Sequence, residues 1–209
     1  MNVGILGSGD VAKALAAGFL SRGDRAMLGT REPEKLAEWS QANSGARVGT
    51  FADAAAFGEI VVLATRGTAT VEMLERIAAD AFDGKVVIDA TNPLRFDDAG
   101  PHLAFGFDDS LGERVQRALP TARVVKAFNI VGAPEMVAPT FDGGPPTMFV
   151  AGNDDAAKQT VADILRDFKW DVADLGGIES ARYLEPMCLA WVVYGLRAGN
   201  WHHAFKLLR

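Results

Sequence analysis

A glycine-rich turn near the N-terminus constrains the fold of this chain more than any other feature. Gly7-Ser8-Gly9-Asp10-Val11-Ala12 follows an apolar run that begins at Val3, and it leads into apolar residues at helical spacing. In this pattern the first glycine permits a tight turn, the second lets the backbone approach a phosphate, and the small third residue allows close helix–strand packing. The sequence therefore predicts a turn that places a dinucleotide pyrophosphate at a helix N-terminus, with an ordinary strand-turn-helix connection as the alternative.

Strand-like runs alternate with helical patterns along the chain. We expect strands at residues 2–6, 25–29, 47–50, 60–65, 85–90, 122–127, 147–151 and 171–174, and helices at 11–22, 33–43, 51–57, 68–81, 110–118 and 154–168. Continuously apolar strands are typical of a parallel sheet covered on both faces. We predict an α/β, doubly wound Rossmann-type fold with a mostly parallel sheet. Residues 1–176 would form the nucleotide-binding domain, and residues 177–209 a C-terminal helical tail packed on the same domain.

Composition excludes several classes of function. The chain has 209 residues with 21 basic and 27 acidic side chains, a net charge of −6, which disfavours a nucleic-acid partner. Its longest strongly apolar stretch, residues 187–196, is half the length of about 20 residues that a membrane-spanning helix needs. The first predicted strand begins at residue 2, so we expect no targeting segment, and we expect the single cysteine, Cys188, to be a buried, inert thiol. We expect a cytoplasmic protein with neither a membrane partner nor a metal site.

The end of the second predicted strand favours NADP over NAD. An NAD site usually carries an acidic residue there, which binds the ribose diol. Here the strand ends with Thr30 and Arg31, and Lys35 follows one helical turn later. A hydroxyl, a guanidinium and an ammonium group suit the adenosine 2′-phosphate. Alternatively, these charges belong to a solvent-exposed helix start and bind no ligand. NAD is disfavoured but not excluded, because Glu32 is an acidic residue that can reach the ribose.

Further motifs spread over nearly the whole chain. They are Gly29-Thr30-Arg31, Asp89-Ala90-Thr91-Asn92-Pro93-Leu94, Val124-Val125-Lys126-Ala127-Phe128-Asn129, Ser180-Ala181-Arg182-Tyr183-Leu184-Glu185-Pro186-Met187 and Ala204-Phe205-Lys206-Leu207-Leu208. Together with the glycine turn, this set resembles the NADPH-dependent F420 reductase family and, equally, the cytoplasmic oxidoreductase domain of the STEAP metalloreductases.

The resemblance implies an NADPH site whose nicotinamide faces a flat redox partner, a deazaflavin in the F420 reductases and a flavin in the STEAP-like proteins. By this resemblance the pyrophosphate is bound by Gly7, Ser8, Gly9, Asp10 and Val11, and the 2′-phosphate by Thr30, Arg31 and Lys35. Thr65 and Arg66 lie beside the adenosine and the nicotinamide ribose, and the nicotinamide end is lined by Asn92, Pro93, Asn129 and Ile130.

The sequence shows no obvious catalytic acid or base. Hydride transfer between stacked rings depends on position and electrostatics, because the cofactors carry the reaction. Lys126 and Asn129 are the candidate catalytic residues. Lys126 interrupts an apolar strand, so it either points into the ligand crevice or reaches out at the strand end. Asp89 is expected to stabilise a turn.

For the other polar residues we expect structural or surface roles. We take His102, His202 and His203 as surface residues rather than metal ligands. Arg182 and Glu185 are expected to pair on the outer face of the tail, with contact between Arg182 and an anionic acceptor as the alternative.

The tail is apolar nearly all round between residues 179 and 199, so it is buried on more than one side. It either packs on the sheet or forms a two-fold dimer contact beside the partner-ring pocket, and we expect a homodimer. The sequence predicts an NADPH-dependent oxidoreductase that transfers hydride to a small-molecule redox acceptor, F420 or FMN/FAD. The alternatives are reduction of a small imine, carbonyl or quinone, and a non-catalytic NADPH sensor.

Overall fold

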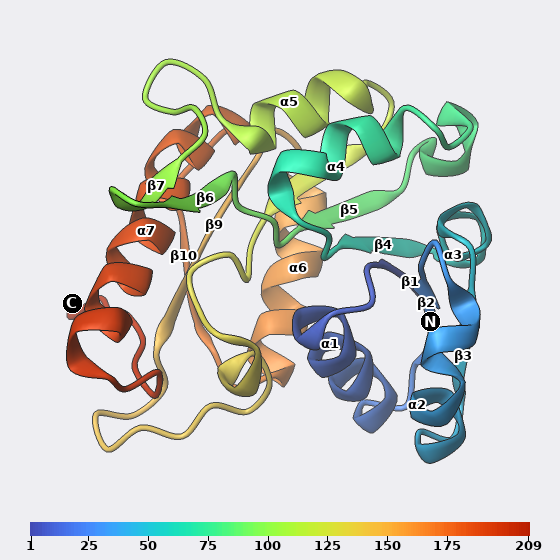
Figure 1. Cartoon of the computed structure of the whole chain (residues 1–209), viewed down its shortest axis with the longest axis horizontal. Helices are drawn as coiled ribbons and strands as arrows, with labels where there is room; N and C mark the ends of the chain where they lie inside the picture. The colour runs from blue at the N-terminus through green and yellow to red at the C-terminus, as the bar shows by residue number, and fades with distance from the viewer.

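The central sheet has eight strands in the order β10-β9-β8-β5-β4-β1-β2-β3, with helices on both faces (Figure 1). The computed structural model describes residues 1–209. Neighbouring strands from β3 to β8 are parallel, β9 is antiparallel to β8, and β10 is parallel to β9. The strands are β1 (Asn2–Leu6), β2 (Arg25–Gly29), β3 (Ala46–Gly49), β4 (Ile60–Leu63), β5 (Val86–Asp89), β8 (Arg123–Lys126), β9 (Thr147–Gly152) and β10 (Asp171–Asp174). The predicted doubly wound, mostly parallel sheet is confirmed.

The helices fall close to the predicted ranges. They are α1 (Asp10–Ser21), α2 (Ala37–Ala42), α3 (Phe51–Phe57), α4 (Gly67–Leu74), α5 (Leu111–Ala118), α6 (Asp155–Asp167) and α7 (Ala181–Ala198), with 3-10 turns at Pro33–Leu36, Ala79–Phe82, Ala133–Glu135 and Ile178–Ser180. Side-chain caps begin three of them: Thr50 on α3, Ser110 on α5 and Asp154 on α6. The helix expected over 68–81 ends early, at Leu74, and resumes only as the 3-10 turn.

Two apolar clusters cover the two faces of the sheet. Successive residues of β4 and β5 alternate between them: Val62 packs in the larger cluster and Val61 in the smaller. The larger cluster takes side chains from α1, α6 and α7, and the smaller one takes side chains from α3, α4 and α5. Because both faces are covered, β4 and β5 are buried throughout, as their apolar sequences predict.

A second, two-stranded sheet was not predicted. β6 (Leu94–Asp97) and β7 (Gly100–Leu103) form an antiparallel hairpin that follows the end of β5 and lies against α7 (Figure 1). Its strands have only four residues each and are partly exposed, and β7 begins with glycine and proline. The apolar–polar alternation of β6 is therefore too short to be recognised as a strand, and β7 shows none.

The expectation of helix through residue 209 is wrong. α7 ends at Gly199, which has the left-handed φ of 62° common after helices. The chain then turns back, and the Phe205 carbonyl accepts a hydrogen bond of 2.9 Å from the backbone N–H of Thr147. The segment after α7 is thus an extended strap along the start of β9. No helix of the chain has the length and apolar character needed to cross a membrane.

Candidate functional site

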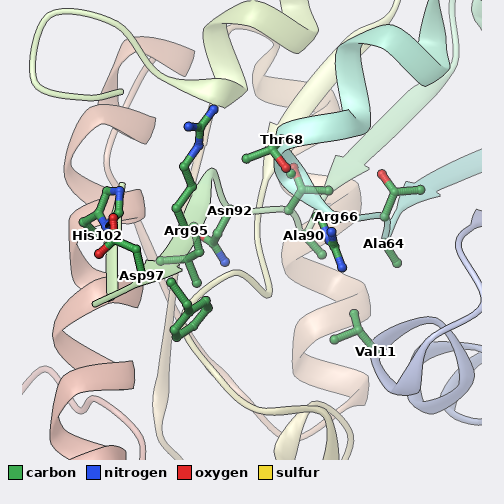
Figure 2. A pocket seen from close by; sticks show the side chains of 14 residues that line it. Val11, Ala64, Arg66, Thr68, Ala90, Asn92, Arg95, Asp97 and His102 are labelled. Atoms are coloured by element: carbon green, nitrogen blue, oxygen red, sulfur yellow. Dashed lines mark ion pairs between the residues drawn. The ribbon is translucent and has the colours of Figure 1, made fainter. Parts of the chain in front are cut away.

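A cavity of about 880 Å³ lies at the carboxyl ends of β4 and β5 (Figure 2). Its walls are Val11 of α1 on one side and the β6–β7 hairpin on the other. In doubly wound sheets ligands bind at the carboxyl ends of the strands where the strand order reverses, which here is between β1 and β4. The lining residues are Val11, Ala64, Thr65, Arg66, Gly67, Thr68, Ala90, Thr91, Asn92, Leu94, Arg95, Phe96, Asp97 and His102.

The two glycines of the N-terminal turn have different environments. Gly7 has φ +151°, and a Cβ there would lie 2.4 Å from the Ala64 carbonyl oxygen, so packing alone requires glycine. A Cβ on Gly9 would meet nothing within 4 Å. Gly9 is also the N-cap of α1, and no side chain caps that helix. Open space at an uncapped helix N-terminus fits an anionic group such as a pyrophosphate.

The residues expected at the 2′-phosphate lie at the end of β2, outside the cavity. Thr30 is buried, and its hydroxyl oxygen accepts a 3.4 Å hydrogen bond from the Glu32 N–H. Arg31 is exposed and forms no ion pair. Lys35 pairs instead with Glu32, and this hydrogen bond lowers the pKa of the Glu32 carboxyl. The structure therefore leaves Arg31 free, whereas Lys35 already has a partner that the sequence did not suggest.

Thr65 and Arg66 both line the cavity. The Thr65 hydroxyl lies 3.0 Å from that of Thr70, which donates to the Arg66 carbonyl at 3.2 Å. A Cβ on Gly67 would lie only 1.9 Å from the Asn92 carbonyl oxygen, so the start of α4 sits directly on the turn after β5. The guanidinium of Arg66 is exposed and forms no ion pair.

Asn92 and Asn129 are joined by reciprocal hydrogen bonds. The Asn92 amide donates to the Asn129 carbonyl at 2.8 Å, and the Asn129 amide donates to Asn92 Oδ1 at 3.0 Å and to the Leu184 carbonyl at 2.9 Å. Asn92 lines the cavity, whereas Asn129 is almost fully buried and its Oδ1 has no donor within the protein. Pro93 is also buried, and the Ile130 side chain packs in the larger core cluster. Asn92 is thus the member of this group that reaches the cavity.

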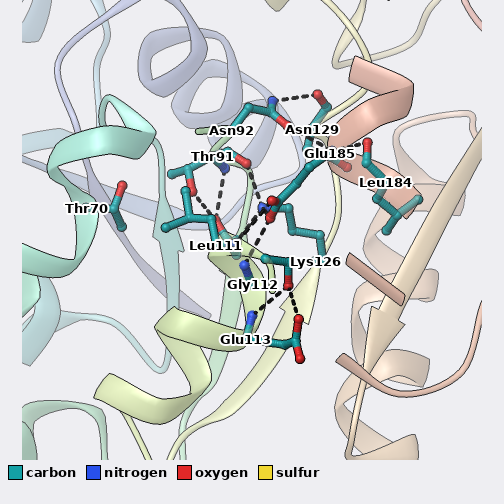
Figure 3. Close-up of polar contacts among 12 residues, drawn as sticks. Thr70, Thr91, Asn92, Leu111, Gly112, Glu113, Lys126, Asn129, Leu184 and Glu185 are labelled. Atoms are coloured by element: carbon teal, nitrogen blue, oxygen red, sulfur yellow. Dashed lines mark hydrogen bonds and ion pairs between the residues drawn. The ribbon is translucent and has the colours of Figure 1, made fainter. Parts of the chain in front are cut away.

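Lys126 does not point into the crevice. Its side chain is 0% exposed, and Nζ lies 3.0 Å from Asp89 Oδ2, 3.0 Å from Glu185 Oε1 and 2.7 Å from the Thr91 carbonyl oxygen (Figure 3). The contacts to Asp89 and Thr91 are hydrogen bonds, and the contact to Glu185 is an ion pair. The candidate catalytic role of Lys126 is therefore corrected, because its ammonium group is buried against these partners and does not line the cavity.

The two carboxylates around Lys126 hold neighbouring elements. Asp89 Oδ1 accepts from the N–H and the hydroxyl of Thr91, at 2.9 and 2.6 Å, which confirms its turn-stabilising role. Glu185 accepts from the first two N–H groups of α5, Leu111 and Gly112, each at 3.0 Å. Burial lowers the pKa of Lys126, but the charges of Asp89 and Glu185 outweigh it and raise the pKa overall. This network joins β5, β8, α5 and α7 behind the cavity.

The expected pairing of Arg182 with Glu185 is wrong. Arg182 binds Glu113 through two hydrogen bonds of 2.6 and 2.8 Å, so it too joins α7 to α5. Cys188 is buried as expected, and burial raises the pKa of its thiol to about 12. At neutral pH this thiol is therefore protonated and unreactive.

Sequence reasoning missed the hairpin residues of the cavity wall, and it took His102 for an ordinary surface residue. His102 lines the cavity, and its Nδ1 lies 3.7 Å from Asp97 Oδ2 and 3.2 Å from the Gly100 carbonyl oxygen. Arg95 and Phe96 line the same wall. The available signal was a charged and aromatic run directly after the Asn-Pro turn. His202 contacts Glu135 and His203 stacks on Trp191, away from the cavity.

Comparisons with known proteins agree with this architecture. Residues 2–93 match the family model described as NADP oxidoreductase, coenzyme F420-dependent. A crystal structure from Arthrobacter sp. FB24, described as that of a candidate F420-dependent NADP-reductase, has 36% sequence identity and a TM-score of 0.95 and covers 100% of both chains. The F420-dependent NADP reductase of Methanocaldococcus jannaschii is 29% identical over 90% of this chain and 89% of its own.

The metalloreductase STEAP3 of Rattus norvegicus is 29% identical over 90% of this chain but only 36% of its own length. The chain thus spans about a third of the STEAP relatives it matches. Fold and crevice together define a Rossmann-type α/β protein with a cavity at the carboxyl ends of its central strands, and the relatives place it among the NADP oxidoreductases. The chain belongs to the family of coenzyme F420-dependent NADP oxidoreductases, and it is an NADP-dependent enzyme.

Proposed function

We propose that this enzyme transfers hydride between NADP(H) and a flavin-type acceptor, with the deazaflavin F420 as the first candidate and FMN or FAD as the second. The observation that carries the proposal is the 880 Å³ cavity, which adjoins the glycine turn and continues past the strand ends to the β6–β7 hairpin. This volume is ample for a nicotinamide and a second ring system in one site. The F420 candidate is supported by the family and by the relatives of similar length.

The pyrophosphate would lie over the glycine turn, against the backbone of Gly7, Ser8, Gly9, Asp10 and Val11. The uncapped start of α1 supplies N–H groups and the positive end of the helix dipole there. The open space at Gly9 admits the phosphates, whereas Gly7 shapes the turn by its contact with Ala64.

The adenosine 2′-phosphate would be held by Thr30, Arg31 and Lys35. Arg31 is the strongest of the three, because its guanidinium is exposed and unpaired and can bind two phosphate oxygens. Lys35 would join it by leaving Glu32, which costs little because both side chains are exposed to solvent.

Thr65 and Arg66 would lie beside the adenosine and the nicotinamide ribose, and Asn92 would reach the nicotinamide end, with Pro93, Asn129 and Ile130 buried behind it. Asn92 is fixed by Asn129, so its position needs no rearrangement when a ligand binds.

Bound NADPH supplies hydride from C4 of its nicotinamide to the acceptor ring. The protein's own residues would position the two rings in a crevice that is open to solvent, because several lining side chains are exposed. Reduction of the acceptor also takes up one proton, which solvent can provide. The absence of a buried acid in the cavity wall is consistent with this chemistry.

Acceptor-dependent oxidation of NADPH tests the proposal. The protein is mixed with NADPH and, in separate reactions, F420, FMN and FAD, and absorbance is followed at the nicotinamide band. We expect oxidation that requires both protein and one of these acceptors. NADPH binding without any acceptor reduction would favour the sensor alternative, and turnover with a small imine, carbonyl or quinone alone would favour the reductase alternative.

We also propose that the enzyme is a homodimer formed through α7. Tyr183, Tyr194 and Leu196 are each more than half exposed on this helix, and large apolar side chains in such number are typical of contact surfaces. Light scattering should then give about twice the mass of one chain, and Tyr194→Asp should lower it. A wild-type mass equal to one chain would contradict the dimer.

A further inference from the structure

We propose that Arg95 binds an anionic group of the hydride acceptor, so that the β6–β7 hairpin selects acceptors that carry a phosphate or carboxylate over neutral ones. The inference rests on the proposed function and names its specificity residue. It follows from the place of Arg95 in the crevice, its lack of a partner, and the aromatic side chain beside it.

Unpaired arginines follow three strands of the sheet at their carboxyl ends. Arg31 follows β2 and Arg66 follows β4, while Arg95 belongs to the hairpin that follows β5. Strands β2, β1, β4 and β5 are consecutive neighbours, so at a spacing of about 4.8 Å the first and last lie roughly 14 Å apart. The glycine turn lies between Arg31 and Arg66, at the end of β1.

The order of the strands indicates that the three arginines face different anionic groups. In a site of this kind the adenosine lies over the end of β2, and the pyrophosphate lies at the helix after β1. Arg31 and Arg66 flank those two positions. Arg95 lies on the far side, beyond the nicotinamide end, where the dinucleotide carries no phosphate. An anion bound by Arg95 therefore belongs to the second ligand.

The directions of the side chains agree with this assignment. Figure 2 shows Arg66 directed toward Val11 on α1, and Arg95 directed the opposite way, from the hairpin toward α5. Neither guanidinium forms an ion pair, although the chain carries more acidic than basic side chains. Asp97, the acidic residue nearest in β6, faces His102 instead.

The hairpin also offers a surface for a flat ring. Side chains alternate between the two faces of a strand, so Arg95 and Phe96 occupy opposite faces of β6. Phe96 is 65% exposed and lines the cavity, which is unusual for a large aromatic side chain without a partner. Arg95 and Phe96 both line the cavity from opposite faces of β6, so they suit a ligand whose flat ring system contacts one face of the hairpin and whose anionic tail reaches the other.

Two flavins that differ only in charge test the proposal directly. FMN and riboflavin share the same ring, and FMN adds one phosphate. Their dissociation constants are measured by quenching of flavin fluorescence in the presence of saturating NADP⁺. We expect the wild-type protein to bind FMN more tightly, and Arg95→Gln to weaken FMN about tenfold while changing riboflavin less than about twofold.

The matched control is Arg25→Gln. Arg25 is also exposed and unpaired, but it begins β2 and so lies at the opposite edge of the sheet. This variant should bind both flavins as the wild type does. Phe96→Ala should weaken both flavins alike, by about three- to tenfold, because it removes ring contact rather than charge.

The same comparison is made with F420 and with its fragment that keeps the deazaflavin and sugar chain but lacks the charged tail. Discrimination lost in Arg95→Gln supports the proposal for either ring. Equal weakening of charged and neutral ligands, or no preference in the wild type, would overturn it. Failure of all four compounds to bind would instead contradict the proposed function itself.

Discussion

The two walls of the crevice are built in different ways. The sheet wall is backbone packed against backbone, because Gly7 and Gly67 leave no room for a Cβ against Ala64 and Asn92. The hairpin wall is made of side chains, among which Arg95 and Phe96 are exposed to solvent. From this difference we infer that the sheet wall binds the dinucleotide, and we propose that the hairpin wall selects the acceptor.

The buried network behind the cavity supports both walls. Lys126 binds the turn after β5 through Thr91 and reaches α5 and α7 through Glu185. Breaking this support should have the largest effect on the molecule.

Lys126→Met should destabilise the fold by about 3–5 kcal/mol, because it leaves the carboxylates of Asp89 and Glu185 buried without their counter-ion. Urea unfolding followed by circular dichroism measures the change. Arg95→Gln serves as the control and should stay within about 0.5 kcal/mol of wild type, since its side chain is exposed. Similar stabilities for Lys126→Met and wild type would mean that the network is not a support.

Gly9→Val should weaken NADPH binding by more than about a hundredfold, or about 2.7 kcal/mol, and leave the free energy of unfolding nearly unchanged. The valine side chain would occupy space that is open in the protein and needed by the pyrophosphate. Gly7→Val is the contrasting variant, and it should lower stability because of the clash with Ala64. Calorimetric titration and thermal unfolding separate the two effects. Retained binding in Gly9→Val would make the turn purely structural.

Arg31→Ala tests whether the residues after β2 bind the adenosine 2′-phosphate. Loss of a charge-assisted phosphate contact should weaken NADPH by about 1.5–3 kcal/mol and leave NADH nearly unchanged. Dissociation constants for both coenzymes, measured on the same preparation, provide the test. Equal losses for NADPH and NADH would remove the 2′-phosphate role from Arg31.

The stability of the wild-type protein should fall at strongly alkaline pH. The folded pKa of Lys126 is raised above the ordinary 10.5, so its contribution is fully present below that pH and is lost as the pH rises through the folded pKa. Unfolding free energies measured from pH 9 upward should therefore decline more steeply for wild type than for Lys126→Met. Parallel declines would show that other groups dominate.

Much of the sheet wall could be predicted from the sequence. β4 and β5 are continuously apolar because they are buried on both faces, and the glycine turn has a fixed spacing. The Thr30-Arg31 pair could be placed at the end of β2 because the strand itself could be predicted. Elements with regular burial have a regular apolar sequence pattern, and this pattern predicts where they begin and end.

The hairpin and the network could not be predicted in this way. β6 and β7 have four residues each and are partly exposed, and the Gly-Pro start of β7 reads as a turn, so the short alternation of β6 does not separate the hairpin from a loop. The partners of Lys126 are Asp89 and Glu185, which lie far apart in the sequence. They meet only because α7 packs against β7 and α5 in the folded chain. The strap after α7 was misjudged because Ala204 and Phe205 pack on the larger core cluster without forming a helix, and the Phe205 backbone bonds to Thr147 at the start of β9.

The central claim is direct hydride transfer from NADP(H) to a flavin-type ring, and isotope transfer to F420 tests it most directly. The protein is mixed with NADPH deuterated at C4 on each face in turn, together with F420, and the reduced deazaflavin is analysed by mass spectrometry. Because the deazaflavin ring accepts hydride at a carbon atom, a transferred deuterium does not exchange with water. The account predicts one deuterium in the product from one of the two labelled forms. Reduced product without label from either form, or no reduction of F420, FMN or FAD at all, would contradict it.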